Sequence, residues 1–465
     1  MAEQATAPAP ARLFGTDGVR GVAGELLTGE LALRLGSAVT ATSPVAAPQV
    51  LIVRDTRESG EMLEAAIAAG VAAAGGHALL GGVLPTPGAP LLMRRLGFDL
   101  AAVVSASHNP YRDNGIKFFG ADGTKLSDAD EERVESLVRA GDAEGAAVTT
   151  AGVPPVGRVR ELHGAGADYL RELELRFRDL DLSGKRIVLD CAHGATYRVA
   201  PEIFRRLGAE VTALAVEPDG RNINADCGST HVSTLAQRAR GALAGGQSGS
   251  DGGRYDIAFA FDGDGDRVLA VDGQGDVVDG DELLALSALH LRGAGRLPGG
   301  GVVVTVMTNF GFHQAMGQSG VEVATTPVGD RHVLAELLER GWALGGEQSG
   351  HIIDTGFVPS GDGIAAALLT LEALGGRDLS ERDGMRKLPQ RLVNVAVADR
   401  ESLESATVVW EAVERESDGL EGRGRVLVRP SGTEPLVRVM VEAPDEDECV
   451  VITERLVATV ERELG

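Results

Sequence analysis

QVLIVRDTRESG, from Gln49 to Gly60, carries an apolar run into a polar loop, and an Ala-rich segment and then GGHALLGG follow it. The same order begins again with RIVLD at Arg186–Asp190 and with VVVTVM at Val302–Met307. Near-continuous β-branched runs followed by amphipathic helices are typical of parallel strands with crossover helices, because both faces of such a sheet are covered. The pattern therefore predicts three similar α/β domains with mixed, largely parallel sheets.

The segment after about Lys387 has a different pattern. The runs LVNVAVA, GRVLVRP and PLVRVMVEA precede a final helix at Asp447–Leu464. Strands first and a helix last predict a smaller C-terminal α+β domain. A chain of 465 residues is too long for one core, and we expect four domains around a central cleft. Their expected bounds are 1–160, 161–261, 262–380 and 381–465.

Charge and cysteine usage narrow the classes of partner. The formal net charge is -24 at pH 7, whereas nucleic acids and anionic membranes select basic surfaces. No apolar run reaches the length of a membrane span. The three cysteines, Cys191, Cys227 and Cys449, are odd in number and far apart, so neither a disulfide framework nor a CxxC metal site is expected. A cytoplasmic protein with no nucleic-acid or membrane partner is predicted.

The first candidate site is SASHNP, in which Ser107 and His108 follow the apolar run LAAVV. Ligands bind at the carboxyl ends of strands in open α/β sheets, so Ser107 is a candidate nucleophile. The motif does not match the G-x-S-x-G elbow of α/β-hydrolases. Taken alone it is equally typical of ordinary turn chemistry.

The second candidate site is FDGDGDR, in which Asp262, Asp264 and Asp266 alternate with two glycines. The glycines let the backbone curl, and three carboxylates can then bind one hard cation. Without a metal, three close carboxylates would repel one another. An EF-hand is excluded because Arg267 and Gly273 stand where that loop needs Gly and Glu. A solvated acidic turn remains the alternative.

Two shorter motifs carry weaker signals. In GGEQSGH, the residues Glu347, Ser349 and His351 alternate, as side chains do along one side of an extended segment. Such groups suit sugar hydroxyls, although a surface loop explains them equally well. In FGTDGVRG, Arg20 is a cation in a glycine-containing loop, and a helix-entry loop is the simpler interpretation.

The motif RPSGTEP suits a phosphate. Successive backbone N–H groups, two hydroxyls and a planar guanidinium can cradle an anion, and a further arginine follows on the next strand. The residues concerned are Arg429, Ser431, Gly432, Thr433 and Arg438. No Walker motif occurs, so nucleotide hydrolysis is disfavoured. A Gly-containing hairpin turn is the alternative.

Together and in this order, the motifs resemble those of the α-D-phosphohexomutase family, from about Leu13 to the C-terminal helix. The resemblance implies that Ser107 carries a phosphoryl group and, with the three aspartates, holds Mg2+. It places Arg267 beside the transferring phosphoryl group and makes Lys117 and Arg20 candidates for assisting proton transfer, with His108 next to the nucleophile. It assigns the GGEQSGH motif to the sugar and the RPSGTEP motif to the phosphate.

The motifs SASHNPYRDNGIKFF, GGEQSGH and RPSGTEPLVRVMVE resemble those of the amino-sugar branch of that family. This implies interconversion of glucosamine 6-phosphate and glucosamine 1-phosphate through a bisphosphorylated sugar, for UDP-N-acetylglucosamine and peptidoglycan precursors. A glucose or mannose phosphate mutase, a phosphatase, and a non-catalytic sugar-phosphate or Ca2+ module are the alternatives. The expected partner is a small sugar phosphate, and a homodimer is an open alternative to a monomer. Pro327 and His332 depart from the family pattern around V-G-D-R, which affects the argument for sugar selection.

Overall fold

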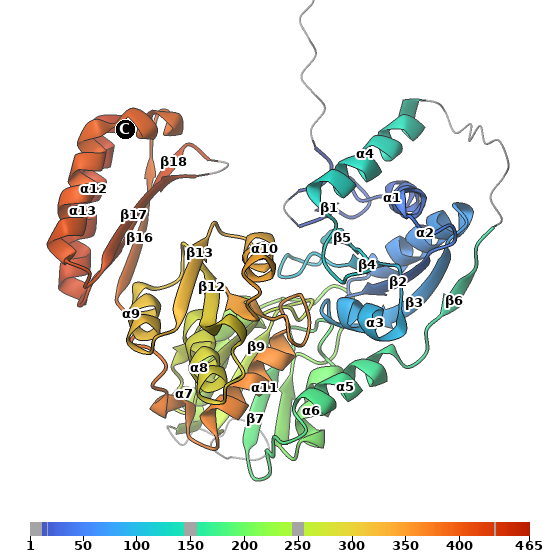
Figure 1. Cartoon of the computed structure of the whole chain (residues 1–465), viewed down its shortest axis with the longest axis horizontal. Helices are drawn as coiled ribbons and strands as arrows, with labels where there is room; N and C mark the ends of the chain where they lie inside the picture. The colour runs from blue at the N-terminus through green and yellow to red at the C-terminus, as the bar shows by residue number, and fades with distance from the viewer. Residues whose placement is uncertain (1–11, 16, 144–155, 244–254, 432–433) are drawn as a thin grey trace, which may run out of the picture.

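The computed structural model describes residues 12–15, 17–143, 156–243, 255–431 and 434–465. Within these ranges the strands form four sheets, of which the first three mix parallel and antiparallel pairs and the fourth is antiparallel throughout. Figure 1 shows the fourth sheet and its helices on the opposite side of the view from the first domain. The predicted fold class, three α/β domains and a C-terminal α+β domain, is confirmed.

The first sheet has the strand order β1-β5-β4-β2-β3-β6. The strands are β1 (Val19–Val22), β2 (Gln49–Arg54), β3 (His77–Val83), β4 (Leu100–Val104), β5 (Asp113–Phe119) and β6 (Val159–Glu161). The helices are α1 (Gly29–Thr42), α2 (Gly60–Ala73), α3 (Gly88–Leu96) and α4 (Asp128–Ala143). β2 is an inner strand, parallel to both neighbours and with four consecutive buried residues, as its apolar run predicts.

The second sheet has the order β11-β10-β9-β7-β8. The strands are β7 (Arg186–Asp190), β8 (Glu210–Leu214), β9 (Ile257–Phe261), β10 (Val268–Asp272) and β11 (Val277–Val278), and the helices are α5 (Ala165–Arg176), α6 (Val199–Arg206) and α7 (Val232–Leu243). The boundary expected at residue 261 falls between β9 and β10, which pair antiparallel in this one sheet. The aspartate motif is therefore a hairpin loop within the second sheet. An antiparallel hairpin has no crossover helix to mark its continuity in the sequence.

The third sheet has the order β13-β12-β14-β15. The strands are β12 (Gly301–Thr305), β13 (Glu322–Thr326), β14 (Leu344–Gly346) and β15 (Ile352–Asp354), and the helices are α8 (Gly280–Gly293), α9 (Phe310–Gln318), α10 (Asp330–Arg340) and α11 (Gly363–Leu374). A capping box of Asp279 and Glu282 starts α8, which satisfies backbone N–H groups at its first turn.

The fourth sheet has the order β16-β18-β17. The strands are β16 (Gln390–Ala396), β17 (Arg425–Pro430) and β18 (Leu436–Glu442), and the helices are α12 (Thr407–Leu420) and α13 (Glu446–Leu464). The final helix is where the sequence predicts it. The order of elements differs, because α12 lies between β16 and β17 and was not predicted.

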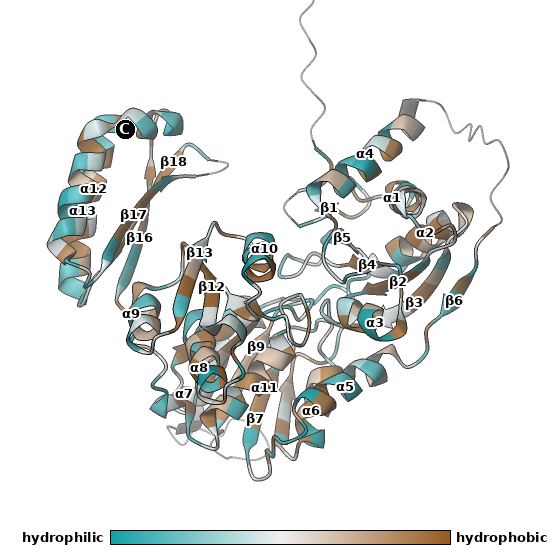
Figure 2. Ribbon diagram, viewed as in Figure 1, coloured by the Kyte–Doolittle hydropathy of each residue, from teal (hydrophilic) through white to brown (hydrophobic). Residues whose placement is uncertain are grey.

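Buried side chains divide the molecule unequally. One continuous apolar cluster joins the first three domains, with members such as Leu51, Leu189 and Val302, whereas the C-terminal domain has a cluster of its own around Val439. Figure 2 shows inner strands such as β2 and β7 as hydrophobic and the outer side of α13 as largely hydrophilic. No helix in the described ranges combines the length and hydropathy that a membrane span requires. The first three domains therefore share a core, and the fourth is packed separately.

Candidate active site

Ser107 lies in the loop after β4, hereafter the serine loop, residues 105–110. Its side chain is buried, and its Oγ donates a hydrogen bond of 2.5 Å to Asp262 Oδ2. The backbone φ of Ser107 is +51°, in the left-handed region that residues other than glycine rarely adopt. Such a conformation persists only where the surroundings hold it. Residues 155 positions apart in the chain thus place a hydroxyl directly on a carboxylate.

Two side chains that the sequence analysis missed hold this loop. The guanidinium of Arg57 donates to the backbone oxygens of Ser107 and Asn109, at 2.9 Å each, and forms a buried ion pair with Asp55 at 2.9 Å. The side-chain amide of Asn224 donates to the same two oxygens, at 2.9 and 3.1 Å. Both residues bind main-chain oxygens, so they fix the backbone that carries the Ser107 side chain.

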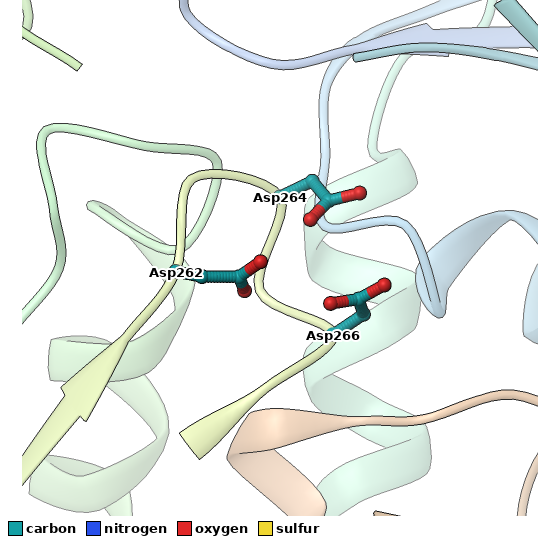
Figure 3. Close-up of side chains that lie close together, drawn as sticks. All are labelled: Asp262, Asp264 and Asp266. Atoms are coloured by element: carbon teal, nitrogen blue, oxygen red, sulfur yellow. The ribbon is translucent and has the colours of Figure 1, made fainter. Parts of the chain in front are cut away.

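The loop between β9 and β10, residues 262–266 and hereafter the aspartate loop, gathers three buried carboxylates. Figure 3 shows Asp262, Asp264 and Asp266 turned toward a common space, and one oxygen from each lies within 4.8 Å of the others. Among the described residues, Asp264 Oδ1 and Asp266 Oδ1 are buried with no hydrogen-bond partner. Burial, followed by the charges of Asp266 and Asp264, raises the pKa of Asp262 well above its usual range. Unpaired buried carboxylate oxygens of this kind fit a bound metal cation.

Close backbone approach joins the two loops. A Cβ at Gly263 would lie 2.5 Å from the backbone oxygen of Ser107, which no side chain tolerates. The glycine between the first two aspartates therefore serves contact with the serine loop as well as turn geometry.

Lys117, on β5, is the buried cation of the site. Its Nζ lies 3.2 Å from Asp264 Oδ2 and 3.0 Å from Asp17 Oδ2, and its side chain is 1% exposed. Burial disfavours the charged amine, but the two carboxylates outweigh burial and raise the pKa of Lys117. Lys117 therefore stays protonated beside the aspartate loop. Arg20, which was also predicted, pairs with Asp17, the same carboxylate that Lys117 contacts.

His108 and Arg267 meet next to Ser107. His108 Nδ1 is 3.4 Å from Ser107 Oγ and 3.2 Å from Arg267 Nη1. Burial, and then the positive charge of Arg267, lower the pKa of His108, so its imidazole is neutral at pH 7. The side chain of Arg267 is 27% exposed, with Nε 3.8 Å from Asp266 Oδ1. A solvent-accessible guanidinium beside a hydroxyl and a neutral imidazole suits an anionic substrate group.

The predicted sugar residues lie between β14 and β15, in the segment 347–351, hereafter the sugar loop. Glu347 Oε1 accepts a hydrogen bond of 3.1 Å from the N–H of Gly329, and Ser349 is exposed. His351 is buried, with Nδ1 3.6 Å from Asp266 Oδ2. The structure thus sets His351 against the aspartate loop, while Ser349 faces solvent. Pro327 and His332, which depart from the family pattern, are both exposed.

The predicted phosphate residues lie apart from these loops. Arg429 on β17 and Arg438 on β18 are cross-strand partners. Burial, and then the charge of Arg438, lower the pKa of Arg429. Ser431 is buried, and its carbonyl oxygen accepts a hydrogen bond of 2.9 Å from Arg400. Two facing guanidiniums repel each other unless an anion lies between them. Gly432 and Thr433 lie outside the described residues. We call Arg429, Ser431 and Arg438 the phosphate seat.

The structure does not bring all predicted residues into contact. Across the described ranges, no hydrogen bond or ion pair joins the phosphate seat to the serine loop or the aspartate loop. Arg429 instead approaches Met307 of the third domain, with Nη2 3.6 Å from its sulfur atom. The predicted site residues therefore form a tightly connected group, from the first three domains, and a separate group on the fourth.

Four family profiles match the chain in order. Phosphoglucomutase/phosphomannomutase α/β/α domains I, II and III match residues 11–145, 167–275 and 279–392, and the C-terminal domain of that family matches 392–458. The chain belongs to the phosphoglucomutase/phosphomannomutase, or α-D-phosphohexomutase, family, as its motifs indicate. It is an isomerase of that family.

Among members of the family, the chain is similar over nearly its whole length to phosphoglucosamine mutases. The chain is 50% identical over 455 residues to the phosphoglucosamine mutase of Desulforudis audaxviator, with 96% of this chain and 97% of that protein covered. It is 44% identical over 459 residues to the phosphoglucosamine mutase of Geobacillus kaustophilus, with 98% and 99% covered.

Solved structures support the fold. A phosphoglucomutase/phosphomannomutase family protein from Burkholderia thailandensis superimposes with a TM-score of 0.79 at 22% identity, over 97% of each chain. An N-acetylphosphoglucosamine mutase from Aspergillus fumigatus, solved in complex with GlcNAc-6P and magnesium, gives a TM-score of 0.67 at 17% identity, over 97% of this chain and 96% of that one.

Proposed function

We propose that the protein interconverts glucosamine 6-phosphate and glucosamine 1-phosphate through a phosphorylated Ser107 and a bisphosphorylated sugar. The observation that carries the proposal is the hydrogen bond of 2.5 Å between Ser107 Oγ and the buried aspartate loop. In phosphorylated Ser107, phosphorus would be bonded to Oγ, the atom that donates this hydrogen bond to Asp262. The relatives at 44–50% identity, which are phosphoglucosamine mutases, support the choice of amino sugar.

The aspartate loop is proposed to hold Mg2+ together with an oxygen of the phosphorylated serine. Its unpaired buried oxygens fit a hard cation, and the relative from Aspergillus fumigatus was solved with magnesium. When bound, the ion neutralises negative charge on the phosphoryl group during transfer. Without an ion, the same three buried carboxylates repel one another.

The chain's own residues supply positioning and charge for the transfer. In the first step the bond between phosphorus and Ser107 Oγ breaks, phosphorus bonds to a sugar hydroxyl oxygen, and the proton of that hydroxyl passes to the departing Ser107 Oγ. Arg267, a partly exposed cation at the site, is proposed to face the transferring group, while Lys117 and Arg20 assist the proton transfer. Phosphoryl transfer depends on such positioning and charge stabilisation more than on covalent help.

A second phosphate on the sugar would account for a phosphate seat that is separate from Ser107. While one end of the sugar reacts at Ser107, the phosphate seat is proposed to hold the other end, and Glu347 and Ser349 to contact the ring between them. The bisphosphorylated intermediate must then turn around, so that its other phosphate returns to Ser107. A seat on a separately packed domain can release and rebind the intermediate without disturbing the reaction centre.

The product suits the supply of UDP-N-acetylglucosamine and of peptidoglycan precursors, and we place the enzyme in the cytoplasm. Its three cysteines are all free thiols, as expected in a reducing compartment.

The decisive experiment is a substrate panel on enzyme preloaded with phosphate. Glucosamine, glucose and mannose 6-phosphates are compared in a coupled assay with Mg2+, and intact mass reports the phosphorylated fraction. We expect the highest kcat/KM with glucosamine 6-phosphate, and loss of both turnover and phosphorylation in Ser107→Ala. A large preference for glucose or mannose phosphate would refute the substrate assignment. Net release of inorganic phosphate would instead indicate a phosphatase.

A further inference from the structure

Charged side chains form a continuous path from Asp264, in the middle of the aspartate loop, to Asp266 at the end of that loop. Neighbouring side chains along the path form ion pairs with N···O distances between 2.5 and 3.8 Å. Carboxylates alternate with basic groups, so every basic group lies between two acids. In order, the path runs through Asp264, Lys117, Asp17, Lys125, Asp330, His351 and Asp266.

Lys125 is the midpoint of this path and crosses a domain boundary. Its Nζ lies 2.5 Å from Asp17 Oδ1 in the first domain and 2.6 Å from Asp330 Oδ2 at the start of α10 in the third. Its side chain is 16% exposed, so water screens these contacts only partly. Among the described residues, Lys125 is the one cation that contacts both carboxylates.

The two carboxylates depend on Lys125 to different extents. Asp17 also contacts Lys117 and Arg20, so it keeps two cations if Lys125 is removed. For Asp330, the only other basic side chain within ion-pair distance in the described ranges is His351, at 3.8 Å. Without Lys125, His351 is the one basic side chain left near Asp330 in the described ranges. Asp330 is then drawn toward the imidazole of His351, which also contacts Asp266.

Asp330 also belongs to the turn that meets the sugar loop. The preceding residue, Gly329, donates its N–H to Glu347 Oε1, and His351 closes the same loop on its other side. A shift of Asp330 is thus transmitted to both ends of the sugar loop.

We propose that Lys125 is a positioning residue that fixes the sugar loop, through Asp330 and His351, in register with the reaction centre of the first domain. The inference rests on the proposed function, since it assigns Lys125 to that same site. Lys125 need not touch the substrate. It acts by joining Asp17, next to Lys117, to Asp330, next to His351.

A simpler role would be to dock the third domain on the first. A second interdomain contact tests this, because Arg331 of α10 pairs with Asp128 and with Glu131 of α4, at 2.8 Å for the latter. The guanidinium of Arg331 pairs with no member of the charged path among the described ion pairs, and only its backbone N–H donates to Asp330, at 2.7 Å, a contact that substitution of the side chain leaves in place. Lys125→Met and Arg331→Met each remove one cation between the same two domains, and Lys125 alone belongs to the path.

The experiment compares the two variants with the full-length wild-type enzyme. Lys125→Met is expected to lower kcat about 10- to 100-fold, since displacement of catalytic groups by about 1 Å has effects of that size. KM should change less than kcat because the phosphate seat is untouched. Arg331→Met should keep kcat within about twofold, as expected for a partly exposed ion pair. Equal kcat losses in the two variants would overturn the proposal.

Two further measurements keep the result interpretable. Asp330→Asn should resemble Lys125→Met, and the double variant should be no worse than either single variant, because both remove the same link. Fully additive losses would contradict the link. Hydrogen exchange of residues 346–352 should accelerate in Lys125→Met and not in Arg331→Met. This readout needs no substrate, so it tests the positioning role even if no hexose phosphate is turned over and the proposed function fails.

Discussion

The reaction centre and the phosphate seat differ in how they are held. Ser107 is fixed through its backbone oxygen by two side chains from different domains, and its hydroxyl contacts a third segment. The seat has two cross-strand arginines on a domain with its own core, joined to the third domain by contacts such as Arg425 to the backbone oxygen of Thr308 at 2.7 Å. The comparison teaches that interdomain contacts are concentrated at Ser107, whereas the two facing arginines lie on a domain with an apolar core of its own.

The largest effect on turnover in this comparison is expected from Asp264→Asn. The variant removes one charge from the proposed metal ligands and from the contact with Lys117. We expect kcat to fall about 100- to 1000-fold, the range for loss of one preorganised electrostatic group, while circular dichroism shows an intact fold. Turnover at the wild-type rate with saturating Mg2+ would remove the metal assignment.

Arg57→Met tests the Ser107 side of the comparison. It leaves Asp55 without its buried partner and the serine loop without its guanidinium contacts, so we expect a loss of about 3 to 5 kcal/mol in the free energy of unfolding. Turnover should fall about 100-fold from misplacement of Ser107. Urea melts and the coupled assay measure the two effects.

Arg54→Met is the matched control for Arg57→Met. Arg54 pairs with Glu61 and Glu64 on the same segment and donates to neither backbone oxygen of the serine loop. Its side chain is 15% exposed, whereas that of Arg57 is fully buried, so its loss should cost less than the loss of Arg57. If Arg54→Met reduced turnover as much as Arg57→Met, the special role of the serine-loop contacts would be lost.

Arg429→Ala tests the phosphate seat. Loss of one guanidinium from the seat should raise KM about 10- to 100-fold, from the usual value of a hydrogen bond to a charged group, with phosphorylation of Ser107 unchanged. Arg415→Ala is the control, since this residue is on α12 of the same domain and its side chain is 69% exposed. An unchanged KM in Arg429→Ala would exclude the seat.

Asp281→Asn should have the smallest effect on turnover. It tests the contact between the third domain, around residues 308–310, and the fourth domain, which we call the joint. Asp281 accepts a hydrogen bond of 2.8 Å from the N–H of Asn309, and the Asn309 amide donates to Glu442 of β18 at 3.3 Å. Burial, followed by the charge of Asp279, raises the pKa of Asp281 to about 7.

The sign of the pH effect follows from that raised pKa. Between about pH 4 and pH 7 the folded protein binds a proton at Asp281 that the unfolded chain releases, so this contribution to stability is lost as the pH rises. It amounts to at most about 4 kcal/mol, at about 1.4 kcal/mol for each pKa unit. Asp281→Asn should flatten this slope in urea melts at pH 5 and pH 8. An unchanged slope would show that Asp281 is ionised in the folded state.

The sequence predicts the repeated elements well because their signal is local. The β-branched runs of β2, β7 and β12 each become inner or paired parallel strands. The hairpin that holds the aspartate loop was missed because a short antiparallel connection leaves the local apolar pattern unchanged. The helix α12 was missed although its buried residues, Val409, Ala412, Glu416 and Leu420, recur at helical spacing. Sequence patterns report which face of an element is apolar, and they do not report which sheet the element joins.

The site divides in the same way. Ser107 and the three aspartates belong to short motifs, and the structure brings them together. Arg57 and Asn224 were missed because their partners are backbone oxygens 50 and 117 positions away. The one available signal was the pair Asp55 and Arg57 directly after a buried strand. No pattern in the sequence pointed to Asn224.

The joint has a mechanical consequence. Arg425 and Glu442 anchor the near ends of β17 and β18 to residues 308–310, whereas Ser431 lies beyond the far end of β17. Six residues of extended chain make a lever of about 20 Å, so a swing of about 10° at the anchor carries the tip through roughly 3 Å. Small adjustments of two strand ends are thereby converted into a displacement comparable to the length of a hydrogen bond.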